Sequence, residues 1–442
     1  MSPAASPPPT TPTAPPSPRR GVARWMSHPL VVALGWVVAH VIPVYWVSHD
    51  GEALGDVRYY RWGMTGQMDG AMDEYPEVGT WPVKLVHLLT GPELTDVAES
   101  RFIAGFILLN ILTSAVFAAL LWWRGKVRGT ATAVWFWILF IAVSGPIVVT
   151  RLDLFLGLVI AGAVWLLFSN SRARHLAPAL LATATMMKLW PGVLGAVLIG
   201  GWRRRSTWVR VAVFAVSLAA LCLLVVAAGS VDRLVSPLTY QGDRGLQIES
   251  VAATPLMLAA AIASYRDPST AGTWEIGYAA SKSYEITGPG ADAAIAVATV
   301  AQVVMLLAAA AWAVVRLVRD DWTPTLVLAS VLLLTVLVIA TNKVFSPQYI
   351  VWLAPVAAVD LLVLTGKTRR WILAVSGLVL LLAALTAMVY PLLYDGLLSS
   401  APDLGATVVL TLRSITVVVL AVVCAGWTLS ASGRAAPATA AG

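Results

Sequence analysis

Long apolar runs separated by short polar stretches dominate the pattern of this chain. Several of these runs approach or exceed about 18 residues, the length that an α-helix needs to cross the hydrocarbon core of a bilayer. We expect full spans at residues 29–47, 101–123, 131–149, 152–169, 208–229, 292–317, 324–341, 348–365, 371–391 and 405–428. A spanning segment must satisfy its backbone polar groups internally. The pattern therefore predicts an all-α, polytopic membrane protein with about 10 full spans.

The apolar stretch 177–201 differs from these spans. Basic residues lie on both sides of it, at 172–174 and at 203–205. Because lysine and arginine favour cytoplasmic loops, both ends of the stretch should face the cytoplasm. Lys188 and Pro191 interrupt its centre, and proline breaks a helix interior. We expect a re-entrant pair of short helices that meet at this break, giving about 12 membrane helices in total.

The distribution of charge predicts the orientation of the chain. If the N-terminus is cytoplasmic, most basic residues fall in the short loops on that side and most acidic residues in the long loops on the other. The long outer loops span residues 48–100 and 229–290. We therefore expect both termini in the cytoplasm and the working surface on the extracytoplasmic side.

The domain organisation follows from the same pattern. One transmembrane domain is expected over residues 25–430. The tail 1–24 is rich in proline, alanine, serine and threonine, which predicts a disordered cytoplasmic segment. A short flexible tail is expected at 431–442.

Composition excludes several classes of protein. The chain is 58% hydrophobic and 12% charged, with a mean hydropathy of +0.79, which no soluble domain of this size would match. Cys222 and Cys424 both fall within apolar spans, so a disulfide framework or a zinc site is not expected. The net charge of +7 does not indicate nucleic acid, because the positive residues separate by side of the membrane.

Charged residues at membrane depth or at its edge are costly, so each is a candidate for a site. The most informative is Asp56, in the first polar loop after the first span. The others are Arg151, Asp153, Lys188, Arg244, Glu249, Lys343 and Arg413.

Several of these charges also fit structural roles. Arg151 and Asp153 fit an ion pair at a tight turn as well as a binding role, and Arg413 is expected to be the structural partner of a carboxylate. The acidic residues Asp69, Asp73, Glu74 and Glu77 predict a solvated face.

Motifs for soluble cofactor chemistry are missing from the sequence. There is no glycine-rich phosphate loop, no His-Glu-x-x-His zinc signature and no Gly-x-Ser-x-Gly elbow. The energy for any chemistry should therefore come from an activated substrate. For a protein that works at the outer membrane face, a lipid-linked phosphate sugar is the natural donor.

At these residues the chain resembles the GT-C superfamily of membrane glycosyltransferases. It is most similar to glycosyltransferase family 87, the bacterial polyprenyl-phosphate-mannose-dependent α-mannosyltransferases, over about residues 29–427. The motifs that carry the resemblance are Asp56 with Tyr59-Tyr60, Tyr75-Pro76, Arg151-x-Asp153, Lys188-Leu189-Trp190-Pro191, Glu249-Ser250 and Ser346-Pro347-Gln348-Tyr349. The chain departs from the wider superfamily because its first loop has no Asp-x-Asp or Glu-x-Asp. A lone aspartate suits a metal-free base, so we expect neither a metal nor another cofactor.

The resemblance implies a mechanism and a set of partners. The donor would be a polyprenyl-phosphate sugar, with mannose favoured. The acceptor would be a hydroxyl of a lipid-anchored glycan in the bacterial plasma membrane. Asp56 would act as the general base of an inverting transfer. The donor phosphate would be bound by Lys188, Arg244 and Lys343, with Arg151 behind them. The sugar or the acceptor would be bound by Tyr59, Tyr60, Asp153, Glu249, Gln348 and Tyr349.

Two alternatives remain open at this stage. An arabinofuranosyltransferase that uses a decaprenyl-phosphate donor would need the same scaffold and the same base. A lipid or glycan flippase would need access from both sides of the membrane, and the one-sided polar loops argue against it. The sequence leaves the oligomeric state open.

Overall fold

The computed structural model describes residues 25–169, 171–235 and 244–432. Seven helices among these residues are long and apolar enough to cross a membrane. They are α2 (Pro29–His49), α5 (Asp96–Arg128), α10 (Arg205–Ala227), α13 (Ala291–Arg319), α14 (Pro324–Thr341), α16 (Arg369–Ala387) and α17 (Leu404–Ser432). The predicted tail 1–24 and most of the predicted tail 431–442 lie outside the described residues.

The other predicted spans are shorter or broken helices. Residues 131–149 form α6 (Thr132–Val143) and α7 (Ile147–Thr150), and residues 152–169 form α8 (Asp153–Leu167). Residues 348–365 form the 3₁₀ helix η5 (Pro347–Trp352) and α15 (Ala354–Val363). Length and composition thus support seven spans, and the total of about 12 membrane helices stays a prediction.

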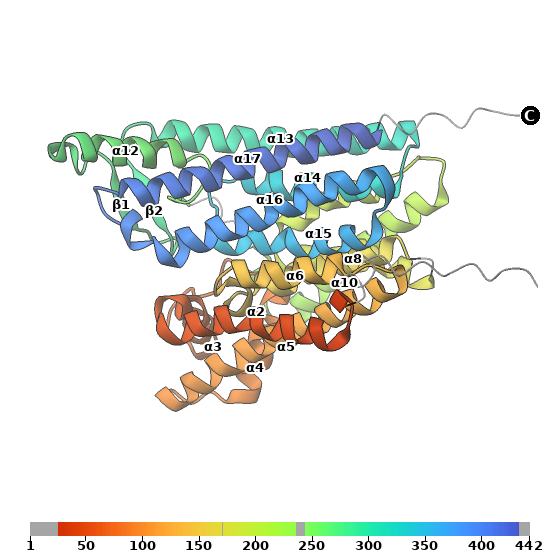
Figure 1. Cartoon of the computed structure of the whole chain (residues 1–442), viewed down its shortest axis with the longest axis horizontal. Helices are drawn as coiled ribbons and strands as arrows, with labels where there is room; N and C mark the ends of the chain where they lie inside the picture. The colour runs from red at the N-terminus through yellow and green to blue at the C-terminus, as the bar shows by residue number, and fades with distance from the viewer. Residues whose placement is uncertain (1–24, 170, 236–243, 433–442) are drawn as a thin grey trace, which may run out of the picture.

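The helices run side by side along the long axis of the molecule (Figure 1). α13, α14, α16 and α17 lie towards one side, and α2, α5 and α6 towards the other. α15 is buried along its length up to Leu362. The main apolar core surrounds it and contains Trp137 and Trp352, two of the largest fully buried side chains.

The stretch 177–201 breaks where the sequence predicts. α9 (Ala177–Met187) ends at Lys188, whose backbone is extended, and the 3₁₀ helix η3 (Trp190–Leu198) follows with Pro191 in its first turn. The break lies beside the start of α8, because the Lys188 side chain pairs with that of Asp153. The chain then returns to the opposite end, where the backbone N–H of Trp202 donates to the carbonyl of Leu317 at 2.9 Å.

Contacts between loops define one end of the helix bundle. Arg204 pairs with Asp320 at 2.5 Å, and Arg369 donates to Thr132 at 2.8 Å. Trp135 donates to the carbonyl of Met26 at 2.8 Å. These are the loops that the charge pattern predicts to be cytoplasmic, so the structure gathers them at one end. The membrane face that this end meets stays a prediction.

The other end carries helices from the long predicted loops. The first loop forms α3 (Gly55–Thr65) and α4 (Glu77–Thr90), and the later loop contains α12 (Thr254–Arg266). Shorter turns join the elements: η1 (Glu52–Leu54), η2 (Arg172–Leu176), η4 (Pro268–Thr270), η6 (Gly366–Thr368), η7 (Met388–Leu392) and η8 (Asp395–Leu397).

The structure is mostly helical, as predicted, and a small β-hairpin at this end is an addition that the sequence analysis did not foresee. β1 (Glu275–Tyr278) pairs antiparallel with β2 (Tyr284–Thr287). The backbone of Ile248 donates to Tyr284, and that of Ile286 donates to Leu246, so residues 246–248 lie along β2. Tyr284–Thr287 alternates β-favouring side chains in a run too short to stand out from a loop in the sequence.

Candidate active site

A polar cavity of about 350 Å³ opens at the end of the bundle that carries the hairpin. Four parts of the chain form its wall: the first-loop region, the turn before α8, the hairpin with the segment before it, and the turn before η5 together with residues 390–394. The side chains that line it include Asp56, Tyr59, Trp62, Glu74, Tyr75, Arg151, Arg244, Gln247, Glu249, Tyr278, Lys282, Ser283, Tyr284, Ser346, Gln348, Tyr390 and Tyr394.

Asp56 and Arg151 form an ion pair in this wall. Asp56 lies in the first turn of α3, where the helix dipole favours a carboxylate. The Asp56 side chain is 37% exposed, whereas that of Arg151 is 4% exposed. The Arg151 guanidinium also lies 5.3 Å from the ring centre of Tyr390. The Asp56 carboxylate is thus exposed to the cavity and paired with a buried guanidinium.

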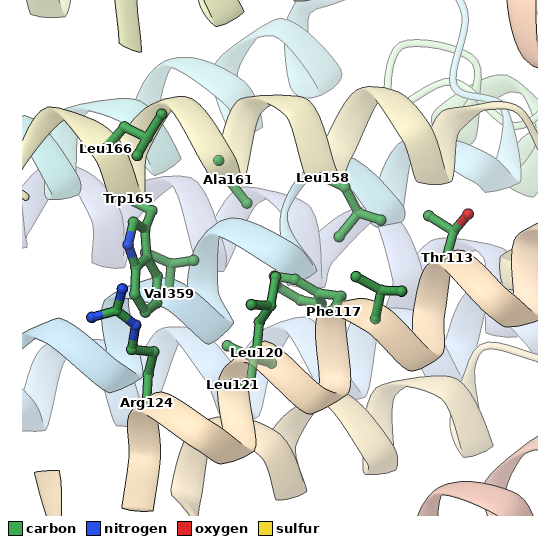
Figure 2. Close-up of a pocket in the computed structure, with 12 residues that line it drawn as sticks. Thr113, Phe117, Leu120, Leu121, Arg124, Leu158, Ala161, Trp165, Leu166 and Val359 are labelled. Carbon is green, nitrogen blue, oxygen red and sulfur yellow. The ribbon is translucent and has the colours of Figure 1, made fainter. Parts of the chain in front are cut away.

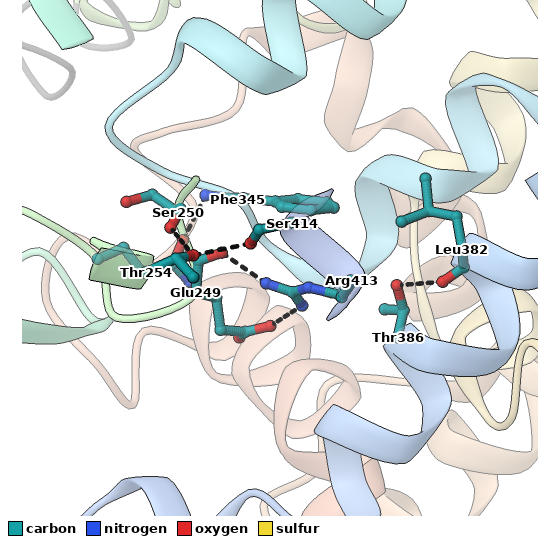
Figure 3. A network of polar contacts seen from close by, with 9 residues as sticks. Glu249, Ser250, Thr254, Phe345, Leu382, Thr386, Arg413 and Ser414 are labelled. Carbon is teal, nitrogen blue, oxygen red and sulfur yellow. Dashed lines mark hydrogen bonds and ion pairs between the residues drawn. The ribbon is translucent and has the colours of Figure 1, made fainter. Parts of the chain in front are cut away.

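Glu249 and Arg413 form a second ion pair, which is fully buried (Figure 3). Arg413 comes from α17 and donates to the Glu249 carboxylate and to the Glu249 backbone carbonyl, each at 2.5 Å. Its guanidinium lies 4.3 Å from the ring centre of Phe345. Beside the pair, the hydroxyls of Thr254 and Ser414 are 2.7 Å apart. Arg413 therefore has the predicted structural role, and it fixes a carboxylate of the cavity wall.

Gln247 ties the segment before α12 to the turn before η5. Its backbone N–H donates to the carbonyl of Lys343 at 3.1 Å, and its side-chain oxygen accepts from the backbone of Phe345 at 2.6 Å. These bonds place Gln247 and Gln348 on the same wall of the cavity. The Lys343 side chain is not among those that line the cavity, so its phosphate-binding role stays a prediction.

Lys188, Asp153 and Tyr349 form a separate cluster behind the wall. The Lys188 ammonium contacts the Asp153 carboxylate at 2.9 Å, and Trp352 donates to the same oxygen at 2.6 Å. Lys188 also lies 5.0–5.4 Å from the ring centres of Tyr75, Tyr349 and Trp352. Of this cluster, only Tyr75 also lines the cavity.

This cluster corrects the suggested pairing of Arg151 with Asp153. Arg151 pairs with Asp56, and Asp153 pairs with Lys188. Arg151 therefore lies in the cavity wall, whereas Asp153, two residues later, lies in the cluster behind the wall.

Glu74 is a cavity residue that the sequence analysis assigned to a solvated face. It accepts a hydrogen bond from the Tyr59 hydroxyl at 2.8 Å, and that hydroxyl accepts one from the Met72 backbone at 2.7 Å. Burial raises the pKa of Glu74, and the bond from Tyr59 opposes the rise. Glu77 is likewise buried, paired with Lys84 and 3.7 Å from Arg233. The solvated-face prediction is wrong for both glutamates, because the loop folds back onto the bundle.

The hairpin closes over this side of the cavity. Its turn residue Lys282 donates to the carbonyl of Gly70 in the first-loop segment at 2.5 Å. The same ammonium lies 5.3 Å from the ring centre of Tyr59. Arg244, just before residues 246–248, also faces the cavity. Two cations and one carboxylate therefore meet on this wall.

Aromatic side chains make up much of the remaining wall. Tyr59, Trp62, Tyr75, Tyr278, Tyr284, Tyr390 and Tyr394 all line the cavity. Rings with a polar tip suit a ligand that has both apolar faces and hydroxyls. Tyr60, by contrast, is fully buried against Phe106 in a satellite core and does not line the cavity. Tyr390 and Tyr394 were missed by the sequence analysis, because they follow an apolar span and carry no charge.

The part of the chain that the structure describes contains no group of three or more histidine, cysteine, aspartate or glutamate side chains arranged to hold a metal ion. Metal-independent transfer stays a prediction.

Comparison with known proteins identifies one family. The model of glycosyltransferase family 87 matches residues 75–341, which is more than half of the chain. The matched region contains Arg151, Lys188 and Glu249, whereas Asp56 precedes it and Gln348 follows it. No curated protein and no solved structure matches the chain.

Proposed function

Because the chain belongs to glycosyltransferase family 87, and is therefore a glycosyltransferase, we propose that it transfers mannose from a polyprenyl-phosphate donor. The acceptor is a hydroxyl of a lipid-linked or cell-envelope glycan, and the transfer inverts the anomeric centre. The cavity supports this proposal, since it combines a paired carboxylate, cations and aromatic rings at one end of an apolar helix bundle. A lipid tail can remain in the membrane while its head group enters such a cavity.

Asp56 is the proposed general base, and its ion pair with Arg151 is the observation that carries the proposal. The acceptor oxygen attacks the anomeric carbon, and the bond from that carbon to the phosphate oxygen breaks. The acceptor proton passes to the Asp56 carboxylate, and the polyprenyl phosphate leaves as the anion. Arg151 holds the carboxylate ionised and oriented before the attack.

Cations on the cavity wall are the proposed partners of the leaving phosphate. Arg244 faces the cavity from the hairpin side, and Arg151 lies beside the base. Fixed positive charges aimed at a developing negative charge stabilise a transition state more than mobile solvent does. Lys188 supports this wall indirectly, because its ammonium holds Asp153 behind Tyr75.

The sugar and acceptor hydroxyls are proposed to bind the polar groups between the rings. Glu249 and Gln348 are fixed in the wall by the contacts described above, so they can accept or donate hydrogen bonds without large rearrangement. Tyr59 adds a ring and a hydroxyl that is already oriented by Glu74 and by the Met72 backbone. Preorganised groups of this kind favour one pose of a bound sugar.

The decisive experiment uses the full-length protein in liposomes with radiolabelled polyprenyl-phosphate mannose and lipids from the source membrane. Asp56→Asn should lower turnover by at least about 100-fold while donor binding persists. Asp69→Asn is the matched control, since Asp69 is an exposed aspartate in the same loop region. Normal turnover of Asp56→Asn would refute the assignment of the base. If the protein transferred sugar only from a polyprenyl-phosphate arabinofuranose donor, mannose would be the wrong sugar, but the assignment of Asp56 as the base would stand.

The extracytoplasmic placement of the cavity has its own test. A single cysteine introduced at position 244 should react with a membrane-impermeant thiol reagent added outside intact cells. Reaction only after the cells are opened would place the cavity in the cytoplasm and overturn the proposed orientation.

A further inference from the structure

A second hollow lies between α5, α8 and α15, away from the polar cavity (Figure 2). It has a volume of about 490 Å³, and its wall is apolar along most of its length. Phe117, Leu120 and Leu158 line it, and Ala161 and Gly162 leave room between the helices. A hollow of this kind on a membrane-embedded surface suits a hydrocarbon chain.

The depth of this groove can be estimated from α5. Its lining begins at Thr113 and ends at Arg124, a separation of about 16 Å along a helix axis. The hydrocarbon core of a bilayer is about 30 Å thick, so the groove extends through about one leaflet. Because α5 starts at the cavity end and Arg124 lies in its last turns, the groove belongs to the leaflet opposite the cavity.

Arg124 gives this groove a charged end. Its guanidinium lies 4.6 Å from the ring centre of Trp123 and 5.3 Å from that of Trp165. No carboxylate within the described ranges forms an ion pair with it. Arginine flanked by tryptophan at the end of a spanning helix is typical of the interface between lipid and water. The groove thus has an apolar body and one cationic end without a protein anion.

We propose that this groove binds one anionic phospholipid from the leaflet opposite the cavity. The lipid phosphate contacts Arg124, and one acyl chain lies along Phe117 and Leu158. The charge and the depth both favour this occupant over the isoprenoid chain of a donor. A donor phosphate must reach the polar cavity at the other end, and its chain would bring no anion to Arg124.

The proposal is tested by native mass spectrometry of the full-length protein with two lipids that have identical acyl chains, phosphatidylglycerol and phosphatidylcholine. The wild type should retain one phosphatidylglycerol in preference to phosphatidylcholine. Arg124→Gln should weaken this retention about tenfold, the effect expected for one charge-assisted contact. Arg203→Gln is the matched control, because Arg203 lies 4.9 Å from the ring centre of Trp202, outside the groove. Equal retention of both lipids, or equal loss in both variants, would overturn the proposal.

A second pair of variants tests the groove itself. Val116→Trp places a large ring across it, whereas Leu112→Trp changes another exposed position of α5 that does not line it. Only Val116→Trp should reduce phosphatidylglycerol retention. If an added polyprenyl phosphate displaces the lipid and Val116→Trp weakens both, the groove belongs to the donor and the proposal is wrong. Should Val116→Trp fail to fold, the comparison of Arg124→Gln with Arg203→Gln still decides the matter.

Discussion

Arg413 in α17 donates two hydrogen bonds of 2.5 Å to Glu249, one to the Glu249 carboxylate and one to the Glu249 backbone carbonyl. The first bond neutralises a buried charge, and the second fixes the chain that carries it. A membrane-spanning helix therefore sets the position of a cavity residue that is distant in sequence. The stability of the bundle and the shape of the cavity depend on the same guanidinium.

Removal of this guanidinium should destabilise the protein strongly. Arg413→Met leaves the buried Glu249 carboxylate without its arginine partner, and breaking a buried ion pair in this way typically costs about 3–5 kcal/mol. We expect a clear fall in the midpoint of thermal unfolding in detergent. Arg101→Met, at an exposed position of α5, should have little effect.

A double variant separates charge from packing at this pair. Glu249→Gln removes the buried charge, so Arg413→Met with Glu249→Gln should lose less stability than the two single changes added together. Strict additivity would show that the two side chains do not depend on one another.

Glu74 should give the protein a pH-dependent component of stability. Burial raises its pKa above the ordinary 4.5, so the folded state favours the neutral carboxyl. This contribution is complete below pH 4.5 and is lost as the pH rises through the raised pKa. Lys282, Arg244 and Tyr59 face the group and limit the rise.

The variant Glu74→Gln isolates that contribution. Its unfolding midpoint relative to the wild type should increase as the pH rises from 4.5 towards neutrality, because only the wild type loses the favourable neutral form. Asp69→Asn, an exposed change in the same loop, should show no such trend. A midpoint difference that stays constant across this range would contradict the assignment.

Lys282 should act mainly on substrate binding. It joins the hairpin turn to Gly70 at 2.5 Å and packs over Tyr59, so Lys282→Ala should loosen the hairpin over the cavity. We expect KM to rise several-fold, about 1 kcal/mol of binding free energy, with a smaller change in kcat. Hydrogen exchange of residues 275–287 should also become faster. Arg266→Ala, at the exposed end of α12, should change neither quantity.

The helical bundle was largely predictable from the sequence because its signals are local. The long helices form where the sequence has apolar runs of spanning length. The break at Lys188 forms where a proline follows shortly after this residue. Each of these signals depends only on residues that are near one another in sequence. The short helices α6 and α8 show the limit of this reasoning. An apolar run gives the extent of a segment but not the point at which its helix bends or stops.

The cavity was predictable only in part because its contacts join distant segments. Asp56, Arg151, Arg244 and Glu249 were selected as charged residues near the membrane edge, and Gln348 was selected through the family resemblance. The structure brings all five together. Glu74 was missed because an acidic run looks alike whether it faces water or folds over a cavity. Tyr60 was selected with Tyr59, yet on a helix adjacent residues face different directions, and Tyr60 faces the core.

Gly79 controls the distance between α4 and α9 next to Lys188. A Cβ at this position would overlap the backbone carbonyl of Met187, which cannot move aside as a flexible side chain could. Gly79→Ala should therefore push the helices apart and destabilise the protein by about 1–3 kcal/mol. The same displacement should disturb Lys188 and lower turnover even in the folded fraction.

The matched control for this change is Gly377→Ala in α16, where a Cβ meets nothing within 4 Å. In that open position alanine favours the helix by up to about 1 kcal/mol, so the unfolding midpoint should stay the same or rise. Both variants exchange glycine for alanine within a helix, so a difference between them reports the α4–α9 contact alone. Equal midpoints for Gly79→Ala and Gly377→Ala would show that α4 does not depend on close approach to Met187.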